Sequence, residues 1–239
     1  MTTSPRALQL NQVEILPGFW HDRLTTNRER TLPAVHAKLK ATGRLDAWRR
    51  EVPNDQLQRH IFWDSDTAKW IEAVGYTLTA GRDATLEAQV DEVIDWMSQI
   101  QETDGYLNSY FSIVEPDARW TNLRDRHELY CAGHLMEAAV AYSRATGKRA
   151  LLDLLCRYTD HIAATFGPRP GQRRGYCGHP EVELALIKLA EATDSPHYLD
   201  LARFFVDERG RSPHYFDLEA QARGEDPRGF WAKTYHYCQ

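Results

Sequence analysis

The chain has 239 residues, of which 42% are hydrophobic and 26% charged, values that predict a folded protein long enough to bury a core. A formal net charge of -5 without basic runs argues against a nucleic-acid partner. No apolar stretch reaches the ~18 residues of a membrane helix, so no membrane partner is expected. The first residues lack the layout of a signal peptide, and the expected location is cytoplasmic.

The leading segment, residues 19–42, predicts one helix that Pro33 kinks or starts late. Three later segments place apolar residues on one stripe and charges elsewhere, which predicts amphipathic helices: 84–101, 149–165 and 197–209. Three others are apolar or small on most sides, which predicts helices buried on most sides: 66–80, 127–145 and 181–192. No strand ladder is visible, although short extended pieces remain open near residues 106–111.

The two kinds of helix alternate, and short turns that contain Gly, Asp or Pro join each buried helix to the amphipathic helix after it. Such a repeat of helical hairpins indicates an all-α solenoid or a closed α/α toroid. In a toroid every inner helix starts on the same rim. The candidate site residues are therefore those near the inner-helix starts: Asp64, Asp66, His127, Glu128, His179 and Glu181.

The two rim histidines are the strongest candidates for ligand contact. A helix N-terminus disfavours an imidazolium, so His127 and His179 should be neutral and able to hydrogen-bond sugar hydroxyls. Metal ligation stays open, although no third ligand stands at a fixed offset. Glu128 and Glu181 have an ordinary explanation as acidic first-turn residues, which does not exclude a second role.

Two further residues are ambiguous. His134 lies two turns after His127 on the same helix, where a core or groove histidine is the simpler interpretation. Asp104 begins Asp-Gly-Tyr-Leu-Asn, which reads as a tight turn but could equally present the carboxylate to a cleft. Paired carboxylates for glycoside chemistry need a defined separation, which spacing in the sequence does not provide.

The cysteines give no sign of a metal centre. Cys131, Cys156, Cys177 and Cys238 lie far apart, and no Cys-x-x-Cys pair occurs. This pattern is atypical of a structural zinc site and predicts free thiols that pack as small hydrophobic residues.

Five blocks in order resemble glycoside hydrolase family 127, which contains β-L-arabinofuranosidases. They are Ser-Asp-Thr-Ala-Lys-Trp-Ile-Glu-Ala at 65–73, Asp-Gly-Tyr-Leu-Asn at 104–108, Arg-Trp-Thr-Asn-Leu at 119–123, His-Glu-Leu-Tyr-Cys-Ala-Gly-His at 127–134 and Gly-His-Pro-Glu-Val-Glu-Leu-Ala-Leu at 178–186. The resemblance extends from about residue 12 to the C-terminus. It implies an (α/α)6 toroid that β-sandwich domains follow in full-length members.

The resemblance also implies a retaining hydrolase with a cysteine nucleophile. That cysteine binds zinc together with other cysteines and a glutamate, and a further glutamate is the general acid/base. Two family histidines that contact the arabinofuranose match His127 and His179, which we therefore assign to substrate binding. The implied substrate is a small carbohydrate, and a homo-oligomer stays open.

The chain departs from the family pattern in ways that affect mechanism. The family's acid/base, nucleophile and zinc ligands lie downstream of the matched region, so this chain is assigned no catalytic residue and no metal ligand. Neither Cys177 nor Cys238 stands in the family's cysteine motif. A glutamine that members often offer to the sugar would fall near Val35, which cannot take that role.

These departures predict that residues 1–239 are the N-terminal portion of one (α/α)6 catalytic domain, truncated to about half a toroid and inactive alone. Half a toroid should also leave inner helices such as 127–145 facing water with a large apolar patch. Two alternatives stay open. One is another α/α-toroid sugar enzyme, an epimerase or unsaturated-uronide hydrolase, which would need a catalytic His or Asp here. The other is a non-catalytic helical remnant.

The truncation hypothesis predicts that the native protein is longer than this chain. Intact-mass spectrometry of the protein purified from its own cells should give a mass well above 27.6 kDa. A native mass of 27.6 kDa would contradict the hypothesis and would exclude catalysis by the family mechanism.

Overall fold

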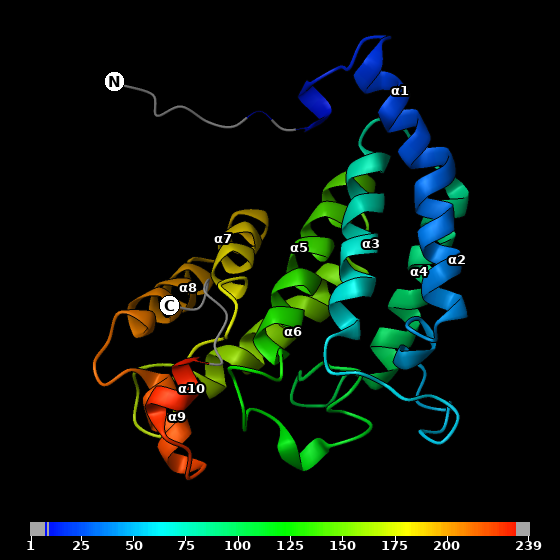
Figure 1. The fold of residues 1–239 in the computed structure, drawn as a ribbon. Helices are drawn as coiled ribbons and strands as arrows, with labels where there is room; N and C mark the ends of the chain where they lie inside the picture. Colours follow the sequence, from blue (N-terminus) through cyan, green and yellow to red (C-terminus); the bar gives the residue numbers. More distant parts are fainter. Residues whose placement is uncertain (1–7, 9, 233–239) are drawn as a thin grey trace, which may run out of the picture.

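The computed structural model describes residue 8 and residues 10–232, and this part of the chain is all-α without a strand (Figure 1). One isolated bridge joins Phe166 to Arg173. The α-helices are α1 (Phe19–Thr26), α2 (Leu32–Ala41), α3 (Trp63–Leu78), α4 (Ala84–Ile100), α5 (Glu128–Thr146), α6 (Ala150–Thr165), α7 (Val182–Thr193), α8 (Pro196–Arg209), α9 (Tyr215–Ala222) and α10 (Pro227–Ala232). Short turns are η1 (Leu10–Gln12), η2 (Asn27–Thr31), η3 (Asp46–Trp48) and η4 (Pro116–Ala118).

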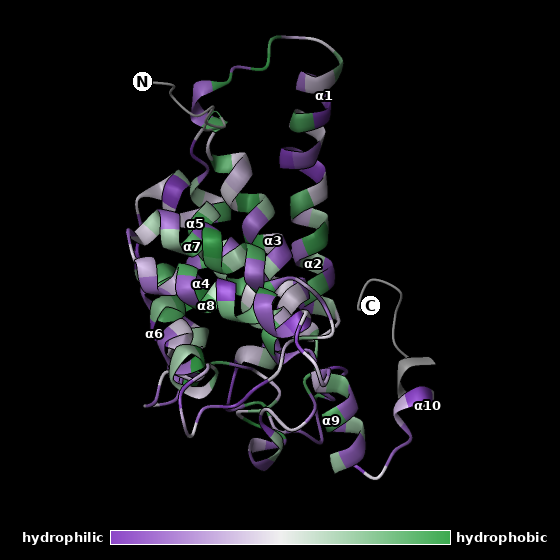
Figure 2. Cartoon of the chain, turned by 90° about the vertical axis from the view of Figure 1, so that its left-hand side faces the viewer, coloured by the Kyte–Doolittle hydropathy of each residue, from purple (hydrophilic) through white to green (hydrophobic). Residues whose placement is uncertain are grey.

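Three helical hairpins form the body of the molecule, as in part of an α/α toroid. The inner helices α3, α5 and α7 pack side by side in that order, and α4, α6 and α8 form a second row in which each contacts its neighbour (Figure 1). Hydrophilic and hydrophobic residues alternate along helices such as α2 and α9 (Figure 2). The predicted alternation of inner and outer helices is confirmed.

Local sequence explains where the hairpins turn. The carboxylate of Asp83 accepts hydrogen bonds from the backbone of Thr85 and Leu86, which caps the start of α4. Gly147 ends α5 with a left-handed backbone, φ 75°, that glycine adopts without strain. Pro196 stands in the first turn of α8, where its missing N–H costs nothing. These residues set the predicted boundaries, most of which agree within one or two positions.

Two glycines allow the inner helices to approach closely. A Cβ atom at Gly75 of α3 would lie 2.9 Å from the backbone of Ala141 and Tyr142 on α5. A Cβ atom at Gly133 of α5 would lie 2.8 Å from the side chain of Glu181 and 3.1 Å from Val182, at the start of α7. Both distances are shorter than ordinary van der Waals contact, so only glycine fits at these crossings.

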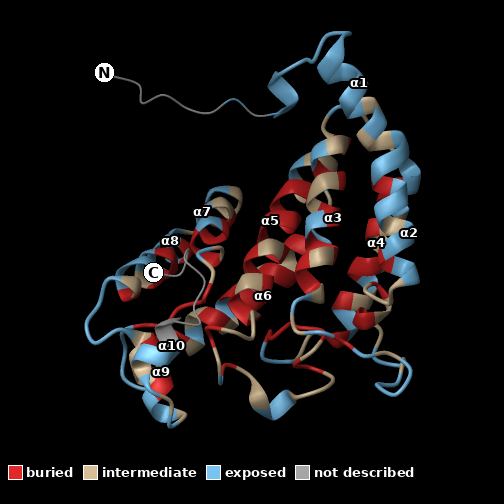
Figure 3. Cartoon of the chain, viewed as in Figure 1, coloured by how far each residue is buried: buried red, intermediate tan, exposed pale blue. Residues whose placement is uncertain are grey.

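The apolar surface expected on the inner helices is absent from α5 and present on α7, where Leu184 and Ile187 are exposed. Helix α5 is buried along most of its length between its neighbours, and Figure 3 shows the contrast with the exposed α1 and α2. The accessible side chains along the inner row are mostly polar: Lys69, Glu72, Tyr76, His134 and Lys188. Exposed apolar side chains lie instead toward the two ends of the row, on or beside α1, α2, α7 and α8: Leu16, Phe19, Trp20, Leu24, Val35, Leu184, Ile187, Leu199 and Val206.

Three local features differ from the sequence predictions or add detail to them: the leading helix, residues 106–111 and the two C-terminal helices. The leading helix is interrupted by the π-helical turn η2 immediately before α2, whose first turn holds Pro33, as expected of a residue that cannot donate a backbone hydrogen bond. Residues 109–111 form a turn, since Asn108 accepts from the backbone of Tyr110 and Phe111, and residues 106–108 have no regular secondary structure. Helices α9 and α10 were not predicted, because eight or fewer residues show little periodicity.

The crossing of α3 and α5 makes a stability prediction. Gly75→Ala should destabilise the protein by about 1–3 kcal/mol, because the new methyl group meets fixed backbone, and this outweighs a helix-propensity gain of about 1 kcal/mol. Urea unfolding measures the difference. Gly210→Ala is the matched control, since a Cβ atom there meets nothing closer than 3.8 Å. Equal stability of the two variants would contradict the close-packing argument.

Candidate functional site

The starts of α5 and α7 bring His127 and His179 together. Their ring centroids are 5.0 Å apart, although 52 positions separate them in the chain (179 − 127). The ring of Phe62, just before α3, lies 5.9 Å from that of His127. The ring of Tyr130 lies 4.7 Å from that of His179 and 5.7 Å from that of His127. The convergence predicted for these two histidines is confirmed, and aromatic rings flank them.

His127 has two features typical of a binding residue. Its backbone is left-handed, with φ 60°, a conformation that costs energy for a residue with a side chain and is concentrated at functional sites. Its Nδ1 atom is buried and has no hydrogen-bond partner among the described residues. A buried polar nitrogen without a partner is costly, and a ligand hydroxyl would remove that cost.

Both imidazoles are neutral at physiological pH. Burial, together with the neighbouring His179, lowers the pKa of His127 to about 4. Burial and then the positive charges of Lys69 and Arg209 lower the pKa of His179. The sequence predicted neutral rings from the helix dipole, whereas burial is the main physical cause. A neutral imidazole has one donor and one acceptor nitrogen, which suits hydroxyl groups.

Lys69 and Tyr130 belong to the same surface, and the sequence analysis did not select them. The Lys69 ammonium of α3 donates to the Tyr130 hydroxyl of α5 over 2.7 Å. The Tyr130 ring is also 4.5 Å from the His134 ring and nearly perpendicular to it. The available signal was the position of Tyr130, three residues after His127 at a helix start, but core packing explains many tyrosines equally well.

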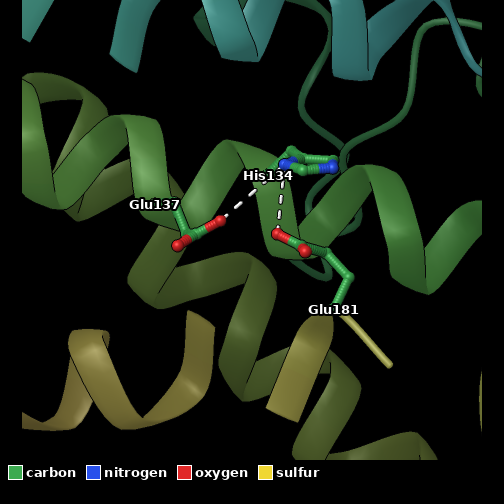
Figure 4. Close-up of side chains that lie close together, drawn as sticks. All are labelled: His134, Glu137 and Glu181. Carbon is green, nitrogen blue, oxygen red and sulfur yellow. Dashed lines mark ion pairs between the residues drawn. The ribbon is translucent and has the colours of Figure 1, made fainter. Parts of the chain in front are cut away.

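A second cluster lies beside these rings. Figure 4 shows His134 between Glu137, on the same helix, and Glu181, just before α7. The Nδ1 atom of His134 is 3.0 Å from the Glu181 carboxylate and 3.7 Å from that of Glu137. Glu137 is also ion-paired with Lys188 of α7. Glu181 therefore has a role beyond the first turn of a helix, and His134 is a largely buried histidine close to two carboxylates.

Three other rim or cleft candidates serve the structure around the site. Asp64 is buried and accepts a hydrogen bond from the backbone of Ser109 over 2.9 Å, and burial raises its pKa to about 6. Asp66 pairs with Arg44 at 2.7 Å. Asp104 caps its own turn by accepting from the backbone of Tyr106, as predicted, and its carboxylate faces His161 of the outer helix α6.

Glu128 lies in the first turn of α5, as predicted, and has a second role there. Its buried carboxylate accepts from the Tyr106 hydroxyl at 2.6 Å and from the Trp120 backbone at 2.7 Å, so it ties the 106–120 loops to the start of α5. Burial raises its pKa to about 7 despite these hydrogen bonds. The sequence left a second role open but did not identify it, because the loop partners are distant in the chain.

The described cysteines do not fit a thiolate zinc centre. Cys131 and Cys177 are buried, and burial raises the pKa of the Cys177 thiol to about 12 and that of Cys131 well above its usual range. The described His, Cys, Asp and Glu side chains form one group close enough for a shared cation, His134, Glu137 and Glu181, which contains no cysteine. Cys238 lies outside the described residues. Within the described residues, no helix is both long enough and apolar enough to span a bilayer.

Comparison with known proteins gives concordant matches. Residues 12–236 match the family model for the β-L-arabinofuranosidase GH127 catalytic domain. A non-reducing end β-L-arabinofuranosidase of Bifidobacterium longum subsp. longum is 37% identical over 208 residues, which cover 83% of this chain and 30% of that protein.

Two solved structures have the same fold. One is a GH127 β-L-arabinofuranosidase from Geobacillus stearothermophilus T6, with a TM-score of 0.85 and 45% identity over 89% of this chain and 35% of that one. The other is a GH127 β-arabinofuranosidase, with a TM-score of 0.80 and 33% identity over 90% of this chain and 35% of that one. The chain thus spans about a third of the length of these relatives.

The buried imidazole of His127 makes a pH prediction. Its folded pKa of about 4 lies below the value of 6.5 for an exposed histidine, so the unfolded chain binds the proton more tightly. The contribution of His127 to stability is therefore complete above pH 6.5 and falls as the pH drops toward 4. His127→Asn, which tolerates a left-handed backbone, should lose less stability between pH 7 and pH 4 than the wild type.

Urea unfolding across this pH range measures the difference between wild type and variant. His197→Asn, which removes an exposed imidazole on α8, is the control. A wild-type-minus-variant difference that stays constant with pH would show that His127 is not buried in a neutral form.

Proposed function

The chain belongs to the catalytic-domain family of the GH127 β-L-arabinofuranosidases, and from that premise we propose that the protein releases L-arabinofuranose from β-linked glycosides. In this proposal the chain supplies part of the sugar-binding surface, with His127 and His179 as the residues that contact the substrate. The matched region covers nearly the whole chain, which supports the assignment of the substrate class.

The observation that carries the proposal is the unpartnered, buried Nδ1 atom of His127 beside the ring of His179. A furanose presents hydroxyl groups on a small, partly apolar ring, and neutral imidazoles hydrogen-bond such groups without the desolvation cost of a charge. Phe62 and Tyr130 add apolar ring surface on either side. We expect these four residues to orient the sugar and to exclude water from one side of it.

The bond-breaking groups are proposed to lie in the part of the relatives that this chain does not span. By family resemblance they are a cysteine nucleophile that binds zinc and a glutamate acid/base. The described carboxylates Asp64, Asp66 and Glu128 have structural partners instead of facing the two histidines. We assign no step to zinc through this chain, and we propose that the 239-residue chain alone does not hydrolyse glycosides.

The test is kinetic and uses the full-length protein. His127→Ala and His179→Ala should each reduce kcat/KM for p-nitrophenyl β-L-arabinofuranoside by about tenfold to a hundredfold, because each removes hydrogen bonds that position the sugar. The melting temperature should change little. His197→Ala, on the outer helix α8, is the matched control and should keep wild-type kinetics.

Unchanged kinetics in both site variants would remove the two histidines from the sugar site. Wild-type protein that cleaves the α-anomer but not the β-anomer would contradict the proposed linkage. Absence of turnover of either anomer by the full-length protein would favour the non-catalytic alternative.

A further inference from the structure

The cluster of His134, Glu137 and Glu181 has no part in the proposed sugar contacts, yet it lies against them. Its three side chains are largely buried, and their ligand atoms all lie within 4.8 Å of one another. The two carboxylates are direct neighbours, since each offers an oxygen atom within 4.8 Å of the other. Helices α5 and α7 are held together here by the close approach at Gly133, so the carboxylates have little room to separate.

The charges around the cluster leave one negative charge without compensation. Lys188 pairs with Glu137, whereas the nearest groups to Glu181 are Glu137 and the neutral His134. The titratable groups that face the cluster from the packed elements are Lys69, Glu72 and Tyr76 of α3, His179 before α7, and Lys188 of α7. If Glu137 and Glu181 were both ionised they would repel each other, and the negative charge of Glu72 adds to that repulsion.

One shared proton resolves this repulsion. Burial and the negative charge of Glu137 raise the pKa of Glu181. Burial acts to raise the pKa of Glu137. Hydrogen bonding from Glu181 and the pairing with Lys188 outweigh burial and hold that pKa below its usual range. Glu181 is then the protonated donor and Glu137 the ionised acceptor, as in other carboxyl pairs in close contact.

The cluster reaches the sugar site through one continuous chain of contacts. The His134 ring meets the Tyr130 ring edge to face at 4.5 Å, and the Tyr130 ring lies 4.7 Å from the His179 ring. Lys69 holds the other end of Tyr130 through its hydroxyl. A displacement of His134 would therefore displace Tyr130 and, with it, one wall of the site.

We propose that Glu137 and Glu181 share a single proton and, through His134, position Tyr130 and His179 for sugar binding. The two glutamates and His134 are positioning residues, since none of them touches the proposed sugar position. The functional part of this inference rests on the function proposed above. The shared proton and the positioning of Tyr130 do not depend on it.

A divalent cation is the competing occupant of the same three side chains, because two carboxylates and an imidazole are a common ligand set. The position of Lys188 favours the proton. Its ammonium group already lies against Glu137, and a cation at the cluster would have to sit beside that positive charge. Metal binding is therefore one of the outcomes that the test distinguishes.

The variants separate the effect of the Glu181 charge from the effect of its side-chain shape. All of them are made in the full-length protein. Glu181→Gln keeps the shape and a donor to Glu137 but cannot ionise. Glu181→Ala removes the link to His134. Glu191→Gln, at an exposed position on α7, the helix that Glu181 precedes, is the matched control.

Infrared difference spectroscopy and crystal structures test the inference without requiring enzymatic turnover. Beside any band from the buried Glu128, the wild type and Glu191→Gln should show a protonated-carboxyl band at neutral pH that Glu181→Gln lacks. Crystals of Glu181→Gln should keep Tyr130 and His179 in place, whereas those of Glu181→Ala should show both rings displaced. Absence of the band, or unmoved rings in Glu181→Ala, would overturn the proposal. So would a zinc-dependent rise in Tm that Glu181→Gln abolishes.

Kinetics provide the functional readout. Glu181→Ala should raise KM about tenfold with kcat nearly unchanged, because it disturbs positioning rather than bond breaking. In the wild type KM should rise at alkaline pH as Glu181 ionises, and Glu181→Gln should remove that rise. If KM of Glu181→Gln still rose at alkaline pH as in the wild type, the inference would be contradicted. If the wild type turns over no arabinofuranoside, the proposed function fails, while the spectra and crystals still decide the inference.

Discussion

The close approach of α3, α5 and α7 is the constraint on which the rest of the structure depends. Gly75 and Gly133 have no side chain at the two crossings, so the backbones of neighbouring inner helices come within van der Waals contact. The helix starts are then held at one rim, which brings the rings of His127 and His179 to 5.0 Å. The same crossing at Gly133 places Glu181 against His134. The close helix packing at these glycines thus brings together both the His127–His179 pair and the cluster of His134, Glu137 and Glu181.

The inner row also decides the electrostatics of the site. Burial keeps the imidazoles neutral and holds Glu181 in a protonatable state, while Lys69 and Lys188 supply the two positive charges that tie Tyr130 and Glu137 in place. Neutral donors and acceptors then stand near the aromatic rings, and the ionised Glu137 is paired with Lys188. Such an environment suits recognition of an uncharged sugar better than that of a charged ligand.

Much of the architecture was predictable because it is local. Helix type, hairpin order and boundaries followed from the periodicity of apolar residues and from turn residues such as Asp83, Gly147 and Pro196. The pairing of His127 with His179 was also predictable, since hairpins of similar length return the chain to the same rim. The expected apolar patch on 127–145 was wrong, because a helix covered by α3, α6 and α7 has little apolar surface left to expose.

The sequence by itself determined the helical hairpins, the family and the two rim histidines, because each depends on short-range pattern or on motifs that are contiguous in the chain. Only the tertiary structure decided the partners of the acidic residues. Asp64 binds Ser109, Asp66 binds Arg44, and Glu181 joins His134 and Glu137. Each contact joins segments that are distant in the chain, and the direction in which a carboxylate points depends on how two helices cross, which no local pattern encodes.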